Sequence, residues 1–152
     1  MYNHILVPVD GSSTSDLAVQ EAIKMAKDQQ QTQLRFVHVV EEARVFWYSE
    51  GYFDITSLQA SLREAGKNIL NKAETLAQQA GVASQTKLLD ADGERTARVI
   101  VEEAESWPAN VIVMGTHGRR GFDHLIFGSV AEGVVRIAPI PILLIRGAKK
   151  GG

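Results

Sequence analysis

Residues 4–13 read HILVPVDGSS, a short apolar run that ends in turn-forming residues. The run is apolar on both faces, which is typical of a strand buried from both sides. Ser12, Ser13 or Thr14 can cap a helix directly afterwards, because their hydroxyls accept hydrogen bonds from free amides of a first helical turn. Asp16 would then lie in that first turn, where the helix dipole stabilises a carboxylate. The segment therefore predicts a buried strand that leads through a tight turn into a helix.

The rest of the chain repeats this alternation. Runs of branched apolar residues predict strands, and apolar residues three or four positions apart predict helices. Strands are expected at His4–Val9, Leu34–Val40, Ser84–Leu89, Asn110–Met114 and Ile140–Ile145, and helices from Ser12–Thr14 to Asp28–Gln31, from Ser57 to Gly81, over Thr96–Glu105 and over Ser129–Ile137. This order predicts one doubly wound α/β domain over residues 1–147, a parallel sheet with helices on both faces, followed by a disordered tail over 148–152.

Composition excludes several classes of function. The chain has 152 residues, a formal net charge of −2 and no cysteine. Long-range attraction to nucleic acids or anionic membranes is therefore not expected, and disulfides, thiolate catalysis and cysteine-ligated metals are excluded. The longest nearly continuous apolar stretch, Ile137–Ile145, is far shorter than the roughly twenty residues that span a bilayer. We expect a cytoplasmic protein without membrane insertion.

Two segments with ligand-binding chemistry follow predicted strands. Val9–Ser12 follows the first strand, and Gly115–Gly121 (GTHGRRG) follows the fourth and leads on to Gly128-Ser129. Ligands of doubly wound sheets bind beyond the carboxyl ends of the strands, where the winding reverses. If the first and fourth strands are neighbours, both segments line one crevice, with Asp10 as the one carboxylate placed there.

The chemistry of these segments suits a nucleotide. Glycines let backbone amides approach a phosphate, and a helix that begins at Ser129 offers free amides and a hydroxyl. Arg119 and Arg120 add positive charge, whereas Asp10 suits a ribose hydroxyl or a magnesium ion. The alternative is that the glycines only make the turn. Neither the phosphate-binding loop with its lysine nor the dinucleotide fingerprint is present.

The glycine spacing is specific. Gly115, Gly118 and Gly128-Ser129 form G-x2-G-x9-G-S, which resembles the ATP-binding signature of the universal stress protein family. The opening HILVPVDGS and the block MGTHGRRGFDHLIFGSVAEGVVRIAPIPILLIR at 114–146 resemble the same family, so that the similarity covers residues 2–146.

The resemblance implies a strand order of 3-2-1-4-5, which places the first and fourth strands side by side. It also implies ATP binding, since every position of the motif is kept. Adenine would lie by Val9 and Val39, Asp10 would contact ribose or magnesium, and the glycines and Ser129 would hold the phosphates. The implied nucleotide-binding residues are Pro8, Val9, Asp10, Val39, Met114, Gly115, Thr116, His117, Gly118, Arg119, Gly128, Ser129 and Val130.

Three functions follow as hypotheses. The first is an ATP-binding, nucleotide-responsive dimeric signalling module of the stress response. The second is a slow ATPase or nucleotidyl-transfer enzyme, although no catalytic residue can be named because no water-positioning base or phosphate-loop lysine is recognisable. The third is a nucleotide-independent module that binds an unidentified protein partner.

Three further features bear on partners. The strand at 140–145 is apolar on both faces and would form a sheet edge, which favours a homodimer that pairs through it, unless the tail covers that edge. Residues 46–53 (FWYSEGYF) are rich in aromatics that could cover a nucleotide, bind a partner or pack back on a helix. The four histidines show no metal-binding spacing. They are His4, His38, His117 and His124.

Overall fold

The computed structural model describes residues 2–42, 55–117 and 128–147. Within these ranges strands and helices alternate in the predicted order. The elements are β1 (His4–Pro8), α1 (Ser13–Lys27), β2 (Gln33–Val40), α3 (Ile55–Gln79), β3 (Ser84–Asp90), α4 (Thr96–Ser106), β4 (Val111–Gly115), α5 (Ser129–Ile137) and β5 (Ile142–Ile145).

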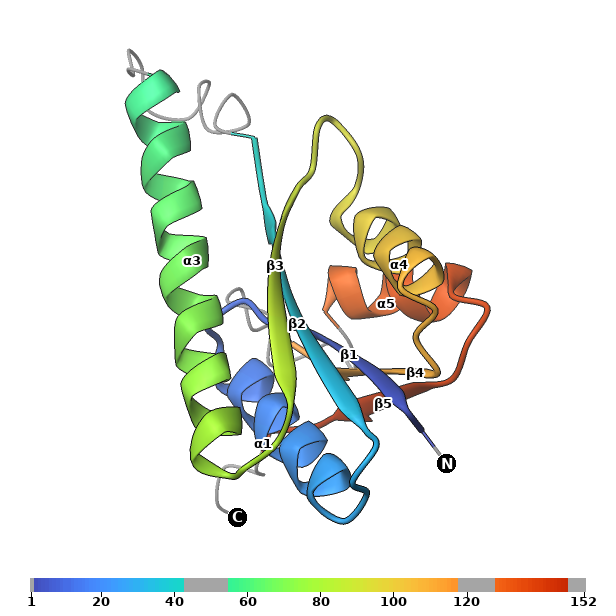
Figure 1. Cartoon of the computed structure of the whole chain (residues 1–152). Coiled ribbons are helices and arrows are strands. Elements are labelled where there is room, and N and C mark those ends of the chain that lie inside the picture. The colour runs from blue at the N-terminus through green and yellow to red at the C-terminus, as the bar shows by residue number, and fades with distance from the viewer. Residues whose placement is uncertain (1, 43–54, 118–127, 148–152) are drawn as a thin grey trace, which may run out of the picture.

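The sheet is parallel and five-stranded, in the order β3-β2-β1-β4-β5 (Figure 1). The order implied by the family resemblance is therefore confirmed. β1 pairs with β2 on one side and with β4 on the other. The winding reverses between β1 and β4, so the segments that follow these two strands leave the sheet side by side.

Helices cover both faces of the sheet, as predicted. α1 and α3 lie on one face, and α4 and α5 lie on the other (Figure 1). Val7, Phe36 and Val113 pack in the core under α1 and α3, whereas Leu6 and Ile112 pack under α4 and α5. Alternate residues of one strand thus enter opposite cores, which explains why consecutive positions are apolar at Ile5–Val7 in β1 and Val111–Met114 in β4.

The turn after β1 is built by local polar contacts. Gly11 has a φ of 82°, a left-handed conformation that glycine adopts without strain. Ser12 is the N-cap of α1, and its hydroxyl accepts a 3.2 Å hydrogen bond from the amide of Ser15. Asp16 lies in the first turn, as predicted. The sequence DGSS therefore encodes both the turn and the start of the helix.

Some boundaries differ from the predictions by one or two residues. β5 begins at Ile142 rather than at 140, because Pro141 has no amide to donate to the sheet. β4 begins at Val111, and the side chain of the preceding Asn110 accepts hydrogen bonds from the amides of Asn3 and His4. α3 is described from Ile55 onward, so the predicted start at Ser57 lies within the helix. No helix within the described ranges is long and apolar enough to span a membrane. The predicted tail at 148–152 lies outside them.

Candidate functional site

Two hydroxyls at the start of α1 hold the ends of β1 and β4 together. The hydroxyl of Thr14 donates a hydrogen bond to the carbonyl of His117, and the Ser12 hydroxyl donates to the same oxygen at 3.3 Å. Thr14 is only 5% exposed. We call these three residues the hydroxyl clasp. It confirms that the segments after the first and fourth strands meet at one point.

Asp10 is fixed by the turn in which it lies. Its carboxylate oxygen Oδ1 accepts a 2.9 Å hydrogen bond from the amide of Ser12. Its own amide donates to the hydroxyl of Ser15 at 3.1 Å. The half-buried Asp10 thus presents an oriented carboxylate beside the clasp. A carboxylate held in this way can accept hydrogen bonds from sugar hydroxyls or contribute one ligand to a magnesium ion.

The N-terminus of α5 lies against the end of β4. Gly128 is its N-cap, and the Gly128 amide donates to the carbonyl of Thr116 at 2.5 Å. Ser129 is exposed and Val130 is half-buried in the first turn. The first amides of a helix have no partner within the helix, and together with the helix dipole they attract anions. The described part of the phosphate motif therefore ends in a helix N-terminus at the sheet edge.

Gly115 has a packing role that the sequence pattern does not reveal. A Cβ atom at this position would lie 2.5 Å from the hydroxyl oxygen of Thr14 and 2.7 Å from its backbone carbon. Only a residue without a side chain lets α1 approach β4 so closely. The contact explains the glycine without a ligand, and it adds Thr14 to the residues that shape the site.

The other predicted residues divide into buried supports and residues outside the described ranges. Val39 and Met114 are buried in the core under α4 and α5, whereas Val9 is buried in the opposite core. Pro8 ends β1. Gly118, Arg119, Arg120, His124 and the aromatic stretch 46–53 lie outside the described residues.

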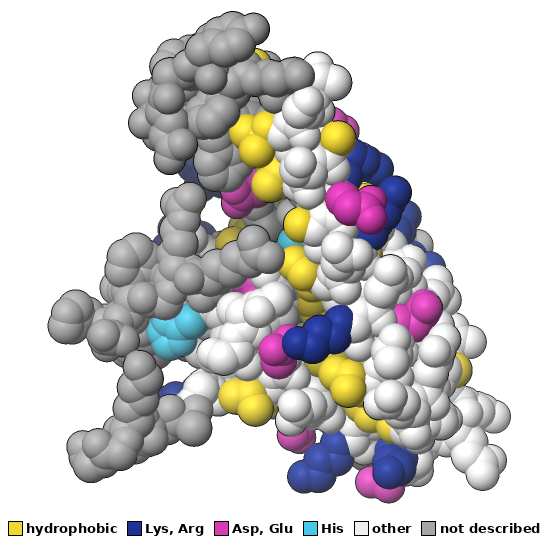
Figure 2. Space-filling view, turned by 90° about the vertical axis from the view of Figure 1, so that its left-hand side faces the viewer, with side chains coloured by type: hydrophobic (Ala, Val, Ile, Leu, Met, Phe, Trp, Pro, Cys, Tyr) yellow, Lys and Arg dark blue, Asp and Glu magenta, His cyan; other side chains and the backbone are white. Residues whose placement is uncertain are grey.

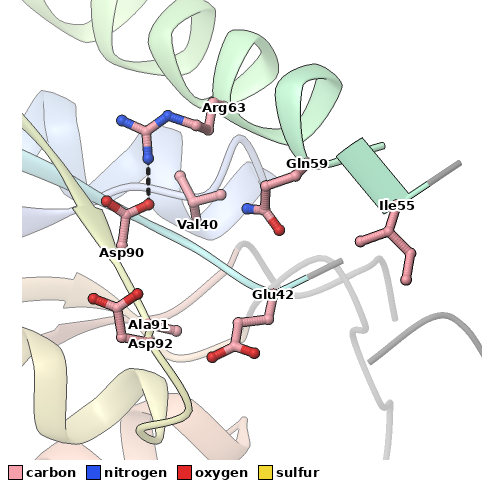
Figure 3. Close-up of a pocket in the computed structure, with 8 residues that line it drawn as sticks. All are labelled: Val40, Glu42, Ile55, Gln59, Arg63, Asp90, Ala91 and Asp92. Carbon is pink, nitrogen blue, oxygen red and sulfur yellow. Dashed lines mark hydrogen bonds and ion pairs between the residues drawn. The ribbon is translucent and has the colours of Figure 1, made fainter. Parts of the chain in front are cut away.

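A hollow of about 400 Å³ opens beside Val40, at the carboxyl ends of β2 and β3. Figure 3 shows the ion pair of Arg63 with Asp90 at one side, and Gln59 and Glu42 pointing toward the open space. The lining residues are Val40, Glu42, Ile55, Gln59, Arg63, Asp90, Ala91 and Asp92.

This hollow carries several carboxylates. Glu42, Asp90 and Asp92 line it, opposed by Arg63 among the lining residues. Their net negative charge disfavours the binding of a phosphate and is compatible with a neutral or cationic group. The sequence pattern places Asp90 and Asp92 in a turn and offers no sign that they face a hollow.

A second hollow, of about 300 Å³, lies between α1 and α3. Val9 and Gly11 line it next to Asp16, Lys72 and Leu76. Apolar side chains form a band on this side of the molecule (Figure 2).

The described residues include no group of three side chains suited to hold a metal ion. Asp10 alone fits a magnesium ion only if other ligands complete the shell. Magnesium is commonly held by one or two carboxylates together with phosphates of a nucleotide.

Comparison with known proteins places this arrangement in a family. The sequence profile of the universal stress protein family matches residues 1–146. The chain belongs to the universal stress protein family. It is 35% identical to universal stress protein MJ0531 of Methanocaldococcus jannaschii over 99% of this chain and 85% of that protein. It is 32% identical to the universal stress protein YxiE of Bacillus subtilis over 96% of this chain and all of that protein.

Several solved structures share the fold. The structure of protein MJ0577 superposes with a TM-score of 0.85 at 24% identity and covers 99% of both chains. A universal stress protein of Archaeoglobus fulgidus in complex with dAMP gives a TM-score of 0.67 at 25% identity, over 95% of this chain and 98% of that one. A universal stress protein in complex with cAMP gives 0.71 at 23% identity, over 97% and 99%.

Proposed function

We propose that this universal stress protein binds ATP at the edge formed by β1 and β4 and acts as a nucleotide-responsive, dimeric signalling module. The observation that carries the proposal is the meeting of the oriented Asp10, the hydroxyl clasp and the N-terminus of α5 at one place. The relatives crystallised with dAMP and cAMP support an adenine nucleotide as the ligand. A cytoplasmic location stays a prediction.

The three parts of ATP would each meet suitable chemistry. The phosphates would take the amides before and within the first turn of α5, with Gly118, Arg119 and Ser129 as further donors. The ribose would lie at Asp10, or the Asp10 carboxylate would supply one ligand to a magnesium ion. The adenine would lie toward Val39, where the adjacent hollow carries carboxylates that can accept hydrogen bonds from an amino group.

Calorimetric titration of the nucleotide-stripped protein tests this function. ATP with magnesium should bind with a dissociation constant in the micromolar range, and AMP should bind at least about tenfold more weakly because it lacks two phosphates. Gly118→Val should abolish ATP binding by filling the space for the phosphates, with urea unfolding as the control for folding. Absence of heat and of thermal stabilisation with either nucleotide would contradict the proposal and favour a nucleotide-independent module.

The dimer is proposed from the edge strand β5. Leu143 on this strand is 38% exposed, and Val135 and Ile137 on α5 are 46% and 41% exposed. Exposed apolar residues beside an unpaired strand edge favour pairing with a second copy. Leu143→Glu should therefore yield monomers in sedimentation velocity experiments, whereas Gln78→Glu, on the exposed surface of α3, should leave the dimer intact. A wild-type monomer at high concentration would contradict the dimer.

A response to nucleotide requires that the monomer and the dimer differ in their affinity for ATP. The dimer dissociation constant measured with and without ATP should therefore differ, and identical constants would contradict this part of the proposal. Dedicated catalysis is not part of it. ATP turnover that survives repeated purification and is lost in Asp10→Ala would instead establish the enzymatic alternative.

A further inference from the structure

His38 connects β2 to the end of β1. Its ring nitrogen Nδ1 lies 2.7 Å from the carbonyl oxygen of Val9. Because a carbonyl can only accept, Nδ1 carries the hydrogen of this bond. The amide of Val9 in turn donates to the carbonyl of Val37 at 2.8 Å. β2 therefore holds the peptide groups on both sides of Val9, one residue before Asp10.

The hydrogen bond from His38 reaches Val9 just beyond the paired part of β1 and β2. The last register pair between β1 and β2 joins Pro8 with Val37, so Val9 lies just beyond it. Its carbonyl points to a side chain that reaches it from the neighbouring strand. The direction of the chain into Asp10 is thus set partly by the histidine.

Gly66 makes room for this ring. A Cβ atom at Gly66 would lie 2.7 Å from Cδ2 of His38 and 2.8 Å from Cδ1 of Leu88. Gly66 is buried in the interior of the 25-residue α3, where glycine costs about 1 kcal/mol relative to alanine. The close approach of the ring accounts for a residue that is otherwise unfavourable in a helix.

We propose that His38 is a positioning residue of the nucleotide site: it fixes the Val9 carbonyl and thereby the place of Asp10, with Gly66 supplying the space. This inference rests on the proposed ATP binding. His38 does not touch the nucleotide in this proposal. Its loss should weaken contacts at the ribose, which AMP and ATP share, and should leave the phosphate contacts unchanged.

Two amide variants of the same residue provide the test. The side-chain amide introduced by His38→Asn can take the place of Nδ1, whereas the amide introduced by His38→Gln lies toward the place of Nε2. We expect His38→Gln and His38→Leu to raise the dissociation constants of both ATP and AMP by about tenfold, the effect of roughly one lost hydrogen bond. The ratio of the two constants should stay at the wild-type value. His38→Asn should remain within about threefold of wild type.

Gly66→Ala gives an independent probe that leaves the histidine in place. The added methyl group should displace the ring and weaken both nucleotides several-fold. In a His38→Ala background, which has no ring to displace, Gly66→Ala should weaken binding little further. Urea unfolding of every variant is measured at several temperatures. The titrations are then made at a temperature at which all variants are folded.

The outcomes separate the inference from the proposed function. If His38→Gln and His38→Leu bind both nucleotides as tightly as the wild type, the positioning role is overturned and the proposal of ATP binding stands. Equal weakening by His38→Asn and His38→Gln, or a changed ratio of the ATP and AMP constants, also overturns it, because either result indicates a general structural effect. If the wild type binds neither nucleotide, the proposed function fails and the positioning role fails with it.

Discussion

The two halves of the carboxyl edge of the sheet differ in chemistry. At the ends of β1 and β4, hydroxyls and backbone amides converge around Asp10, and Gly115 packs directly on Thr14. At the ends of β2 and β3, carboxylates surround an open hollow of about 400 Å³. The first half is closely packed and rich in donors, whereas the second is open and rich in acceptors.

In the proposed function, this difference would give the nucleotide a direction. Phosphates are stabilised by free amides and repelled by carboxylates, so we propose that they lie at β4 and α5. The base, which offers an amino donor, would lie toward β2 and β3. The glycine spacing alone does not show where the phosphates bind, because Gly115 is already explained by its close packing against Thr14.

The largest expected effect is at Gly115. Gly115→Val places a side chain against the Thr14 backbone and should lower the free energy of unfolding by about 3 kcal/mol, the upper range for overpacking. Urea unfolding measures it. The matched control is Gly147→Ala, whose Cβ would lie 3.4 Å from the Thr14 methyl group and should change stability little. If Gly115→Val is as stable as the wild type, the close packing of α1 on β4 is not required for stability.

A smaller effect is expected at Thr14. Thr14→Val keeps the shape and removes the hydrogen bond to the His117 carbonyl, which should cost about 1 kcal/mol of stability. ATP affinity should fall several-fold, because the His117 carbonyl loses the hydrogen bond from Thr14 and keeps the one from Ser12. Thr75→Val, on the exposed surface of α3, is the control. If both variants bind ATP as the wild type does, the clasp does not shape the site.

The smallest effect is expected in the open hollow. Arg63 and Asp90 form an ion pair in which both side chains are more than 40% exposed, and such pairs contribute at most about 1 kcal/mol. Arg63→Ala should change ATP affinity less than about twofold, since its charge is screened by solvent and lies away from the phosphates. Calorimetry measures this change. A tenfold or greater loss of ATP affinity would indicate that the phosphates bind in the hollow.

Much of the fold can be predicted from local sequence patterns. The apolar run HILVPV, the capping sequence DGSS and the periodic helices specify the order of elements, because each depends on neighbours within a few residues. The order of the strands needed the family resemblance, because right-handed crossovers restrict the pairings without selecting one.

The site was predictable only in part. Asp10, Gly128 and Ser129 stand out because they follow strands or begin a helix. The contacts of Thr14 with His117 and of His38 with Val9 join residues 103 and 29 positions apart, and no local pattern encodes them. The hollow likewise depends on how α3 lies over the ends of β2 and β3, so its carboxylates could not be found from the sequence.

The central claim, that ATP lies at the β1–β4 half with its phosphates on α5, is tested most directly by NMR. Backbone amide shifts of the isotope-labelled protein would be followed during titration with ATP and magnesium, and again with AMP. We predict the largest shifts at 10–12, 116–117 and 128–130, with the shifts at 128–130 greatly reduced for AMP. Shifts confined to Glu42 and 90–92, or the same pattern with both nucleotides at 128–130, would contradict the account.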